Sequence, residues 1–370
     1  MGSRHFPART VLFEKESTGV TYRVPALLYL PCVAKLLAFA EERLSADDAH
    51  ANLLVLRRGS IHAPADRHTG RGDMRVLETA TLQHHRSMNP CPLYDEFTGT
   101  LFLFFITVLG RTPEAYQIVT GQNVTRLCCV TSADQGLSWS PATDLTQQVI
   151  GATIKDWATF ALGPGHGIQL RSGRLLVPAY SYHIDCKECF GQLCKTTPHS
   201  FAFYSDDHGQ RWRFGEFIPN LQTGECQLVS VDEEDGSNVL YCNARSPLGF
   251  RVQALSTDDG AVFHGGQLVQ RLVEPPHGCH GSVIGFPAPL VCQLGFKHPN
   301  GPVNVSSGLE FGVLMCQGHH CSPLTLVSLG TNPLPAWAGS GPGTGSCKGS
   351  GEGVEHRRGV LLPGMSSSCS

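Results

Sequence analysis

Arginines and carboxylates occur inside, or directly after, segments whose composition is otherwise typical of buried β-strands. They are Arg23 in "TYRVPALLYL", Glu41 and Arg43 in "KLLAFAEER", Asp48 just beyond, Glu225 in "GECQLV" and Arg245 in "YCNARS". A buried guanidinium or carboxylate group needs a partner of opposite charge or several hydrogen bonds. One interpretation is therefore a set of mutually satisfied ion pairs. The other is that arginines from separate sheets converge on an anionic ligand.

The segments that carry these residues are predicted to be strands of antiparallel sheets. Runs of four to eight apolar residues, bounded by Gly, Pro, Asn or Asp, recur from residue 21 to about residue 259. The longest apolar run, 101–110, is half the length that a bilayer span needs, so we expect a buried strand there. Only the segment 143–162 is expected to hold one or two helical turns.

An octapeptide skeleton recurs three times between these strands. It is "SADQGLSW" at 132–139, "SDDHGQRW" at 205–212 and, more loosely, "STDDGAVF" at 256–263. In the first two copies, Asp134 and Asp207 can accept backbone N–H bonds, Gly136 and Gly209 can adopt positive φ, and the final tryptophan can pack on the sheet. The pattern predicts a turn that closes a hairpin, at spacings compatible with the blades of a propeller.

The composition excludes several classes of protein. The 370 residues are 41% hydrophobic and include 41 Gly and 24 Pro, which favours one or two domains built from short strands. A net charge of −3 gives no reason to expect a nucleic-acid partner.

The fifteen cysteines are expected to be reduced, buried thiols. The opening "MGSRHFPART" has no apolar stretch that could serve as a signal peptide, so a cytoplasmic location is expected. A Cys-x-x-Cys pair, Cys186 and Cys189, lies near Cys194 and His183 and could hold zinc, but its tight, unpaired spacing is atypical. We therefore expect no metal and no cofactor.

The C-terminal segment 291–370 differs from the rest, because it is rich in Gly and Ser and has few charges. It does not alternate like a set of strands, so it is predicted to be poorly ordered. The expected division is a folded domain over 1–290 and a divergent tail over 291–370.

Several longer motifs resemble the vertebrate sialidase (neuraminidase) family. "YRVP" at 22–25 is similar to that family's Arg-Ile-Pro motif, and the three octapeptides are similar to its Asp boxes. "HRSMNPCP" at 85–92, "WATFALGPGHG" at 157–167, "RSGRLLVPAYSY" at 171–182 and "NARSPLG" at 243–249 extend the resemblance, which is strongest to the sialidase-4 branch.

The resemblance implies an all-β fold, a six-bladed β-propeller whose last blades are incomplete or degenerate here. It implies an exo-α-sialidase that hydrolyses terminal sialic acids of gangliosides, glycoproteins and oligosaccharides with retention of configuration. Sialylated glycans would be its partners, and it would be cytoplasmic or peripherally associated with intracellular, lysosomal or plasma membranes.

The family pattern also assigns roles to the charged residues. Asp48 is similar to the acid/base residue that protonates the leaving oxygen, and Glu225 to the glutamate that activates a tyrosine nucleophile, the nucleophile that sialidases use. Arg23 and Arg245 match two of the three arginines that bind the substrate carboxylate.

Other positions resemble residues around the sugar. The resemblance also implies that Arg43 and Glu41 are among the substrate-binding residues. Glu114, Tyr180 and Tyr182 resemble residues near the glycerol side chain, and Met88 resembles one in the N-acetyl pocket. Each has a plainer explanation: the alternating tyrosines could be sheet packing, Met88 could be core, and Glu114 could lie in a solvated turn.

The resemblance does not extend to every catalytic residue. The last tyrosine is Tyr241, and no later arginine lies in the context of the family's third arginine. His280 stands where the family usually has glutamine. The alternative function is therefore a catalytically impaired, truncated propeller that binds sialoglycans or a protein partner.

Overall fold

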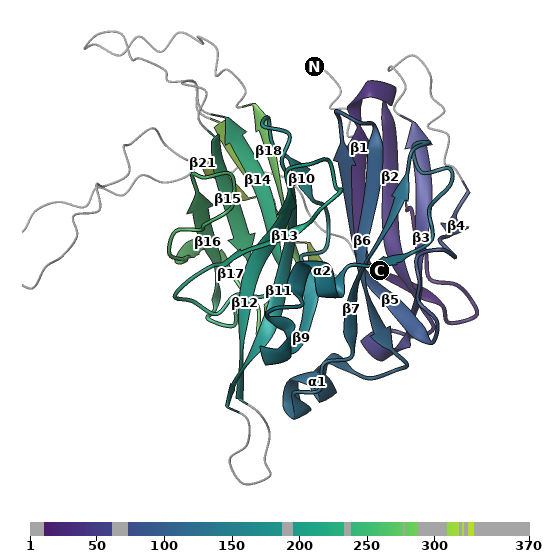
Figure 1. Cartoon of the computed structure of the whole chain (residues 1–370), viewed down its shortest axis with the longest axis horizontal. Helices are drawn as coiled ribbons and strands as arrows, with labels where there is room; N and C mark the ends of the chain where they lie inside the picture. The colour runs from purple at the N-terminus through teal and green to yellow at the C-terminus, as the bar shows by residue number, and fades with distance from the viewer. Residues whose placement is uncertain are drawn as a thin grey trace, which may run out of the picture. The chain divides into compact units, whose positions relative to one another are not determined.

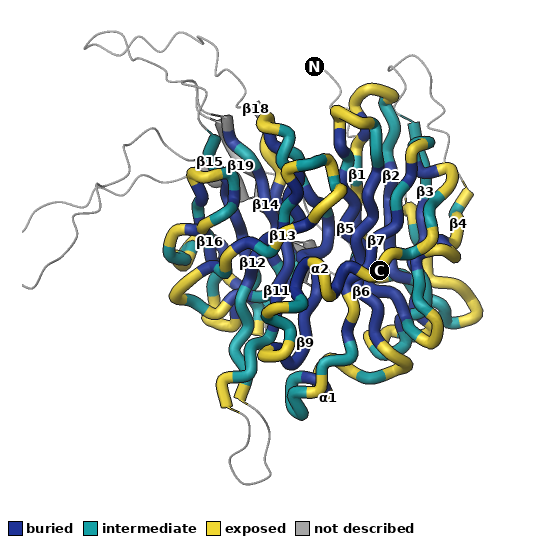
Figure 2. The backbone as a smooth tube through the Cα atoms, in the orientation of Figure 1, coloured by how far each residue is buried: buried dark blue, intermediate teal, exposed yellow. Residues whose placement is uncertain are grey.

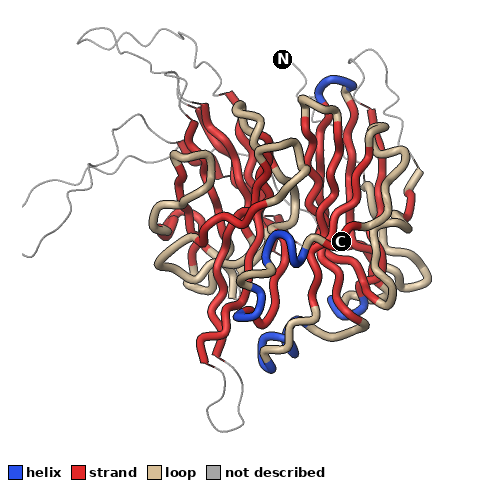
Figure 3. Tube along the Cα trace, viewed as in Figure 1, coloured by secondary structure: helices blue, strands red, loops and turns tan. Residues whose placement is uncertain are grey.

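The computed structural model describes residues 11–60, 73–186, 195–232, 238–276 and 278–287, with three further strands over 309–317, 320–321 and 325–328. All of them belong to one compact unit, residues 1–330. Strands predominate over helices (Figures 1 and 3), which confirms the all-β expectation. The helical elements in this part of the chain are α1 (Glu114–Thr120), α2 (Thr146–Ile150) and the 3₁₀ turns η1 (Pro31–Val33), η2 (Asp48–His50) and η3 (Ile154–Asp156).

The strands form five antiparallel sheets that follow one another in chain order. The first sheet is β1 (Thr21–Leu30), β2 (Lys35–Arg43), β3 (Ala51–Ser60) and β4 (Arg75–Val76). The second is β5 (His85–Asp95), β6 (Thr100–Leu109), β7 (Thr125–Ser132) and β8 (Thr143–Asp144). The third is β9 (Trp157–Leu162), β10 (Ile168–Gln169), β11 (Leu175–Cys186), β12 (Lys195–Ser205) and β13 (Arg213–Phe217), with β9 and β10 both paired to β11.

The fourth sheet has the simple order β14-β15-β16-β17. Its strands are β14 (Cys226–Asp232), β15 (Asn238–Ala244), β16 (Phe250–Ser256) and β17 (Gln267–Val273). The fifth sheet consists of β18 (Gly281–Pro287), β19 (Leu309–Gln317), β20 (His320–Cys321) and β21 (Thr325–Ser328). β19 to β21 lie inside the segment 291–370 that was predicted to form no strands, so that prediction is wrong for these stretches. The strands were missed because Gly312 interrupts the apolar residues of β19, and because β20 and β21 are only two and four residues long.

Each sheet packs face to face on the next one, with a separate apolar core in every interface. Leu37 and Leu103 meet between the first and second sheets, and Phe104 and Phe203 between the second and third. Further cores join the third sheet to the fourth and the fourth to the fifth. This serial packing is a propeller arrangement of blades.

The middle sheets are therefore buried on both faces. In β6, Leu103 points into one core and the next residue, Phe104, into the other, because side chains alternate along a strand. A strand with two buried faces needs a continuous apolar sequence rather than an alternating one. This explains "LFLFFITVLG" and confirms the prediction of a buried strand there. Figure 2 shows the same burial along β5, β6, β11 and β14, with exposed residues at the turns.

The three octapeptides form the predicted turns, which connect β7 to β8, β12 to β13 and β16 to β17, the last two strands of their sheets. The serine Oγ accepts the glycine N–H at 2.9 Å in 132–139, 2.8 Å in 205–212 and 3.0 Å in 256–263. The aspartate accepts the N–H four residues later, and these bonds lower the pKa of Asp207 to about 2. Gly136 and Gly209 have φ of +80° and +83°, and Trp212 is buried, as predicted.

Each turn also contacts the sheet that precedes it in the chain. The glycine of the first copy lies against Leu37 and Leu56 of the first sheet, that of the second against Phe102 of the second sheet, and that of the third against Leu176 of the third sheet. Asp95, the last residue of β5, adds a polar link, because it accepts a bond from His208 Nδ1 at 2.9 Å. The repeats therefore join neighbouring sheets as well as closing hairpins.

Gly209→Ala is predicted to destabilise the fold more than Gly136→Ala. Both substitutions strain a residue with similar positive φ, but only the Cβ at 209 would lie 2.4 Å from the buried ring of Phe102, whereas the nearest atom at 136 is 3.5 Å away. Overpacking of this kind costs about 1–3 kcal/mol beyond the shared strain. Urea unfolding of the two variants measures the difference, and equal losses would contradict the packing of 205–212 on the second sheet.

Candidate active site

The charged residues of the first sheet form one cluster at the end where β1 begins and β2 ends. Arg43 donates to Glu41 Oε2 from Nε at 2.8 Å and from Nη2 at 2.5 Å, and its Nη1 binds Asp48. Arg23 Nη1 lies 3.7 Å from Asp48 Oδ1 and 3.3 Å from the carbonyl oxygen of Ala46. Arg43 and Glu41 are buried, but the Arg23 and Asp48 side chains are 54% and 63% exposed, so only these two are open to a ligand.

A β-bulge places Arg23 at this position. The register between β1 and β2 shifts between Arg23 and Ala26, and Val24 adopts φ of +50° before Pro25. Positive φ is unusual for a β-branched residue, and bulges of this kind change the direction of neighbouring side chains. β5 has the same feature, since Asn89 has φ of +54° before Pro90, and its N–H binds Glu41 Oε1 at 2.7 Å. The bulged backbone of β5 in the second sheet is thus hydrogen-bonded to the Glu41 carboxylate of the first sheet.

A second cluster lines a cavity of about 130 Å³. Its predicted members are Glu114, Tyr180, Tyr182, Glu225 and Arg245. Arg245 Nη1 donates to Glu225 Oε2 at 2.7 Å, and the Tyr180 hydroxyl donates to Glu114 at 3.3 Å. Five of the ten predicted residues, from three sheets or their connections, therefore line one cavity.

Electrostatic effects link the two clusters. The pKa of Glu114 is raised to about 7, first by desolvation and then by the negative charges of Glu225 and, more weakly, Asp48. Although part of the Glu114 side chain is exposed, protein atoms crowd the carboxyl group.

The two tyrosines of the cavity are neutral phenols at physiological pH. Burial, followed by the charge of Glu114, raises the pKa of Tyr180 well above its usual value, and the same causes raise the pKa of Tyr182 to about 12. Their hydroxyls are therefore suited to hydrogen bonding with a polar ligand.

The remaining predicted residues are more buried than the resemblance suggested. Met88 is 9% exposed and packs in the core that also contains Tyr180. Arg43 is 1% exposed, and its guanidinium faces Glu41 and Asp48. In this structure Arg43 contacts Asp48, which is open to solvent, and holds it in place.

The alternative that Glu114 lies in a solvated turn is correct about exposure, but Glu114 is the first residue of α1 rather than part of a turn. Pro113 precedes the helix and Gly121 ends it with φ of +69°, two helix-boundary signals that the sequence does contain. The 3₁₀ turn η2 similarly presents Asp48, and the Asp47 side chain caps it by accepting the Ala49 N–H.

Three buried residues that the sequence did not reveal support the site. Arg86 donates to the carbonyl oxygens of Gly110 and Thr112, just before α1. Arg251 and Glu274 form a buried ion pair of 3.2 Å in the fourth sheet. "HRSMN" and "FRVQA" do place an arginine in a strand, which was the available signal, but their partners are distant in sequence.

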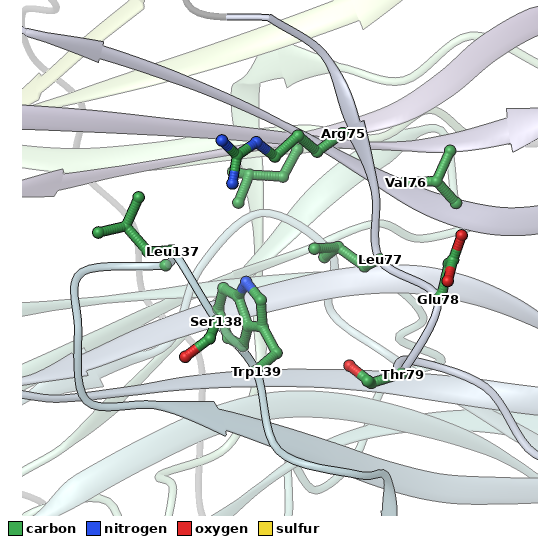
Figure 4. A pocket seen from close by; sticks show the side chains of 10 residues that line it. Arg75, Val76, Leu77, Glu78, Thr79, Leu137, Ser138 and Trp139 are labelled. Atoms are coloured by element: carbon green, nitrogen blue, oxygen red, sulfur yellow. The ribbon is translucent and has the colours of Figure 1, made fainter.

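A larger cavity, of about 200 Å³, lies between the first sheet and the turn 132–139 (Figure 4). Its lining includes Arg75, Leu77 and Trp139, and none of the ten predicted site residues. We therefore place the candidate site at the smaller cavity, which five of the predicted residues line.

No group of His, Cys, Asp and Glu in the described part of the chain has the arrangement of a metal site. Cys189 and Cys194 of the Cys-x-x-Cys segment lie outside it. Nor does any helix within the same residues have the length and apolar character needed to span a membrane.

Comparison with known proteins identifies the family to which the chain belongs. The model of a BNR repeat-like domain matches residues 35–288. Sialidase-4 of Mus musculus is 62% identical over 289 residues, which cover 78% of this chain and 59% of that protein. Sialidase-2 of Rattus norvegicus is 53% identical over 333 residues, covering 87% of this chain and 86% of that protein. The chain thus spans about three fifths of the sialidase-4 sequence but most of the sialidase-2 sequence.

The solved structure of the Hadza microbial sialidase Hz136 has the same fold. Its TM-score is 0.59 at 22% identity, over 79% of this chain and 53% of that one. The 87% coverage by the rat protein exceeds what residues 1–290 alone could supply, so the similarity continues past residue 290.

Glu225→Gln is predicted to lower the pKa of Glu114. The charge of Glu225 helps to raise the Glu114 pKa to about 7, so its removal shifts the titration toward the usual value near 4.5. Carbon-13 NMR titration of the side-chain carboxyl groups, with Glu114→Gln to assign the signal, measures the shift. Asp206→Asn, a carboxylate outside the cavity, is the control, and an unchanged Glu114 titration in Glu225→Gln would show that the two carboxylates do not share a site.

Proposed function

Because this chain belongs to the vertebrate sialidase family, we propose that it is an exo-α-sialidase acting on terminal sialic acids. The reaction is hydrolysis with retention of configuration, and the substrate classes are gangliosides, glycoproteins and oligosaccharides. The observation that carries the proposal is the cavity lined by Glu114, Tyr180, Tyr182, Glu225 and Arg245, in which Arg245 binds Glu225.

Binding of the substrate rests on its carboxylate, which is the feature that distinguishes sialic acid from neutral sugars. Arg23 and Arg245 are cations that can bind a carboxylate with charge-assisted hydrogen bonds. Arg245 already binds Glu225 at 2.7 Å, so an entering carboxylate would share this guanidinium with Glu225. The hydroxyls of Tyr180 and Tyr182 lie beside it and suit the glycerol side chain, and Met88 borders them.

Cleavage requires an acid at the leaving oxygen. Asp48 is the exposed carboxylate of the first cluster, and Arg43 fixes its orientation from the buried side. We assign proton transfer to Asp48. The buried Glu41 acts through Arg43, because it does not reach the surface.

A carboxylate nucleophile would be repelled by the substrate's own carboxylate, which is the physical reason for a tyrosine in this family. Tyr241, the last tyrosine of the chain, is fully buried in β15 and binds Asn243. The raised pKa values of Tyr180 and Tyr182 favour hydrogen bonding over attack. The alternative function is a sialoglycan-binding propeller without turnover.

We also propose that the five sheets are successive blades of a six-bladed propeller. The support is their serial face-to-face packing and the coverage of the rat sialidase-2 sequence. The division into a propeller over 1–290 and a tail over 291–370 stays a prediction, as does a cytoplasmic or peripheral membrane location.

Hydrolysis of a fluorogenic sialoside by the purified chain tests the proposal. We expect turnover in the wild type, a kcat lower by about 10²–10⁴ in Asp48→Asn because the leaving oxygen is no longer protonated, and a raised KM in Arg23→Ala. Asp206→Asn, in an octapeptide turn, serves as the control with wild-type rates.

Folded protein without turnover would refute the hydrolase. Binding of the unsaturated sialic acid analogue, lost in Arg23→Ala, would then identify the sialoglycan-binding function.

A further inference from the structure

Arg251 of β16 is one of the most buried charged groups in the described part of the chain, at 1% exposure. Its Nη1 lies 3.2 Å from Glu274 Oε1 and donates to the carbonyl oxygen of Cys279 at 2.9 Å. Its Nε binds the side-chain oxygen of Asn243. The guanidinium therefore connects β15, the connection after β17 and the start of the fifth sheet.

Glu274 extends this network to the wall of the cavity. Its Oε1 accepts the N–H of Ser246 at 3.3 Å, and its Oε2 accepts the N–H of Cys279 at 2.9 Å. Ser246 follows Arg245 directly and lines the same cavity. The carboxylate thus joins the segment that presents Arg245 to the separate segment that contains Cys279.

The segment beside Cys279 closes on Arg245 from the other side. Gly278 has φ of +72°, and a Cβ there would lie 2.8 Å from Arg245 Cγ and 2.9 Å from its Nε. The Arg245 side chain therefore packs on Gly278. The ion pair fixes the backbone there, because Arg251 and Glu274 both hydrogen-bond the next residue, Cys279.

Stability is a weak explanation for such a pair. Desolvation of two charges offsets much of their attraction, and apolar residues often replace buried ion pairs without loss. What apolar residues cannot replace is the set of directed bonds to Ser246 N, Cys279 N and the Cys279 carbonyl oxygen. These bonds fix the backbone directly after Arg245 and the Gly278–Cys279 backbone on which its side chain packs.

We propose that Arg251 and Glu274 are a positioning pair that sets the direction of the Arg245 guanidinium, and hence the affinity for the substrate carboxylate. The importance of that direction rests on the proposed function. The pair itself does not contact substrate, because both side chains are almost fully buried.

Glu274→Gln tests the proposal because it keeps the shape but replaces one accepting oxygen by an NH₂ group, which cannot accept from an N–H. We expect the dissociation constant of the unsaturated sialic acid analogue, and KM for the fluorogenic sialoside, to rise about tenfold, as for loss of one charge-assisted bond. The matched control is Asp206→Asn, which breaks the Arg174 ion pair of 2.6 Å away from the cavity.

Gly278→Ala is a second variant that leaves the ion pair intact and displaces Arg245 directly. Its control is Gly173→Ala, where φ is +91° but the nearest atom is 3.8 Å from the added Cβ. The expected result is weaker binding in Gly278→Ala only.

The Arg245 Nε–Hε signal in a nitrogen-15 spectrum gives a readout that needs no activity. We expect it to shift in Glu274→Gln and Gly278→Ala and to stay in place in both controls. If Glu274→Gln lowers only the unfolding temperature, with the Arg245 signal and the affinity unchanged, the pair is merely structural and the proposal is wrong. If the wild type neither binds nor hydrolyses sialosides, the proposed function fails, and the signal alone decides the positioning role.

Discussion

A guanidinium group buried between sheets needs hydrogen-bond acceptors around it, and this requirement shapes the end of the fold at which the candidate site lies. Among the described residues, Arg43, Arg86 and Arg251 are the buried arginines. Arg43 is bound by carboxylates, Arg86 by carbonyl oxygens and Arg251 by both. Each therefore fixes a connection between strands, and it is these connections that carry Asp48, Glu114 and Arg245. The exposed Arg23 and the partly buried Arg245 can then face a ligand, because the buried arginines hold the neighbouring segments in place.

Two bulges before proline, one in β1 and one in β5, lie in the same part of the fold. Proline cannot donate to the ladder, and the residue before it is displaced from regular geometry. At Val24 and Asn89 the displaced residue has positive φ, and the strand changes the direction of the side chain just before it. In β1 that side chain is Arg23, and in β5 it is Met88. Backbone strain in these two strands is thus located next to residues assigned to ligand binding.

The sequence predicted the local features of the fold well and the non-local ones poorly. The turns at 132–139 and 205–212 were predictable because the serine and aspartate bonds that close them join residues at most four apart. The buried strand β6 was predictable from its continuous apolar run. Glu274 was missed because its partners, Ser246 and Arg251, are set by the packing of three separate chain segments. Charged residues within strands signalled that partners exist, but only the structure identifies them.

The octapeptide turns have a consequence for the order in which the molecule can assemble. Each turn rests on the blade made before it, as Gly209 does on Phe102 and Gly260 on Leu176. During synthesis on the ribosome the chain emerges N-terminus first. The surface on which each of these turns packs is therefore synthesised before the turn itself. The sheets can thus fold in order from the N-terminus, before the downstream sequence has been made.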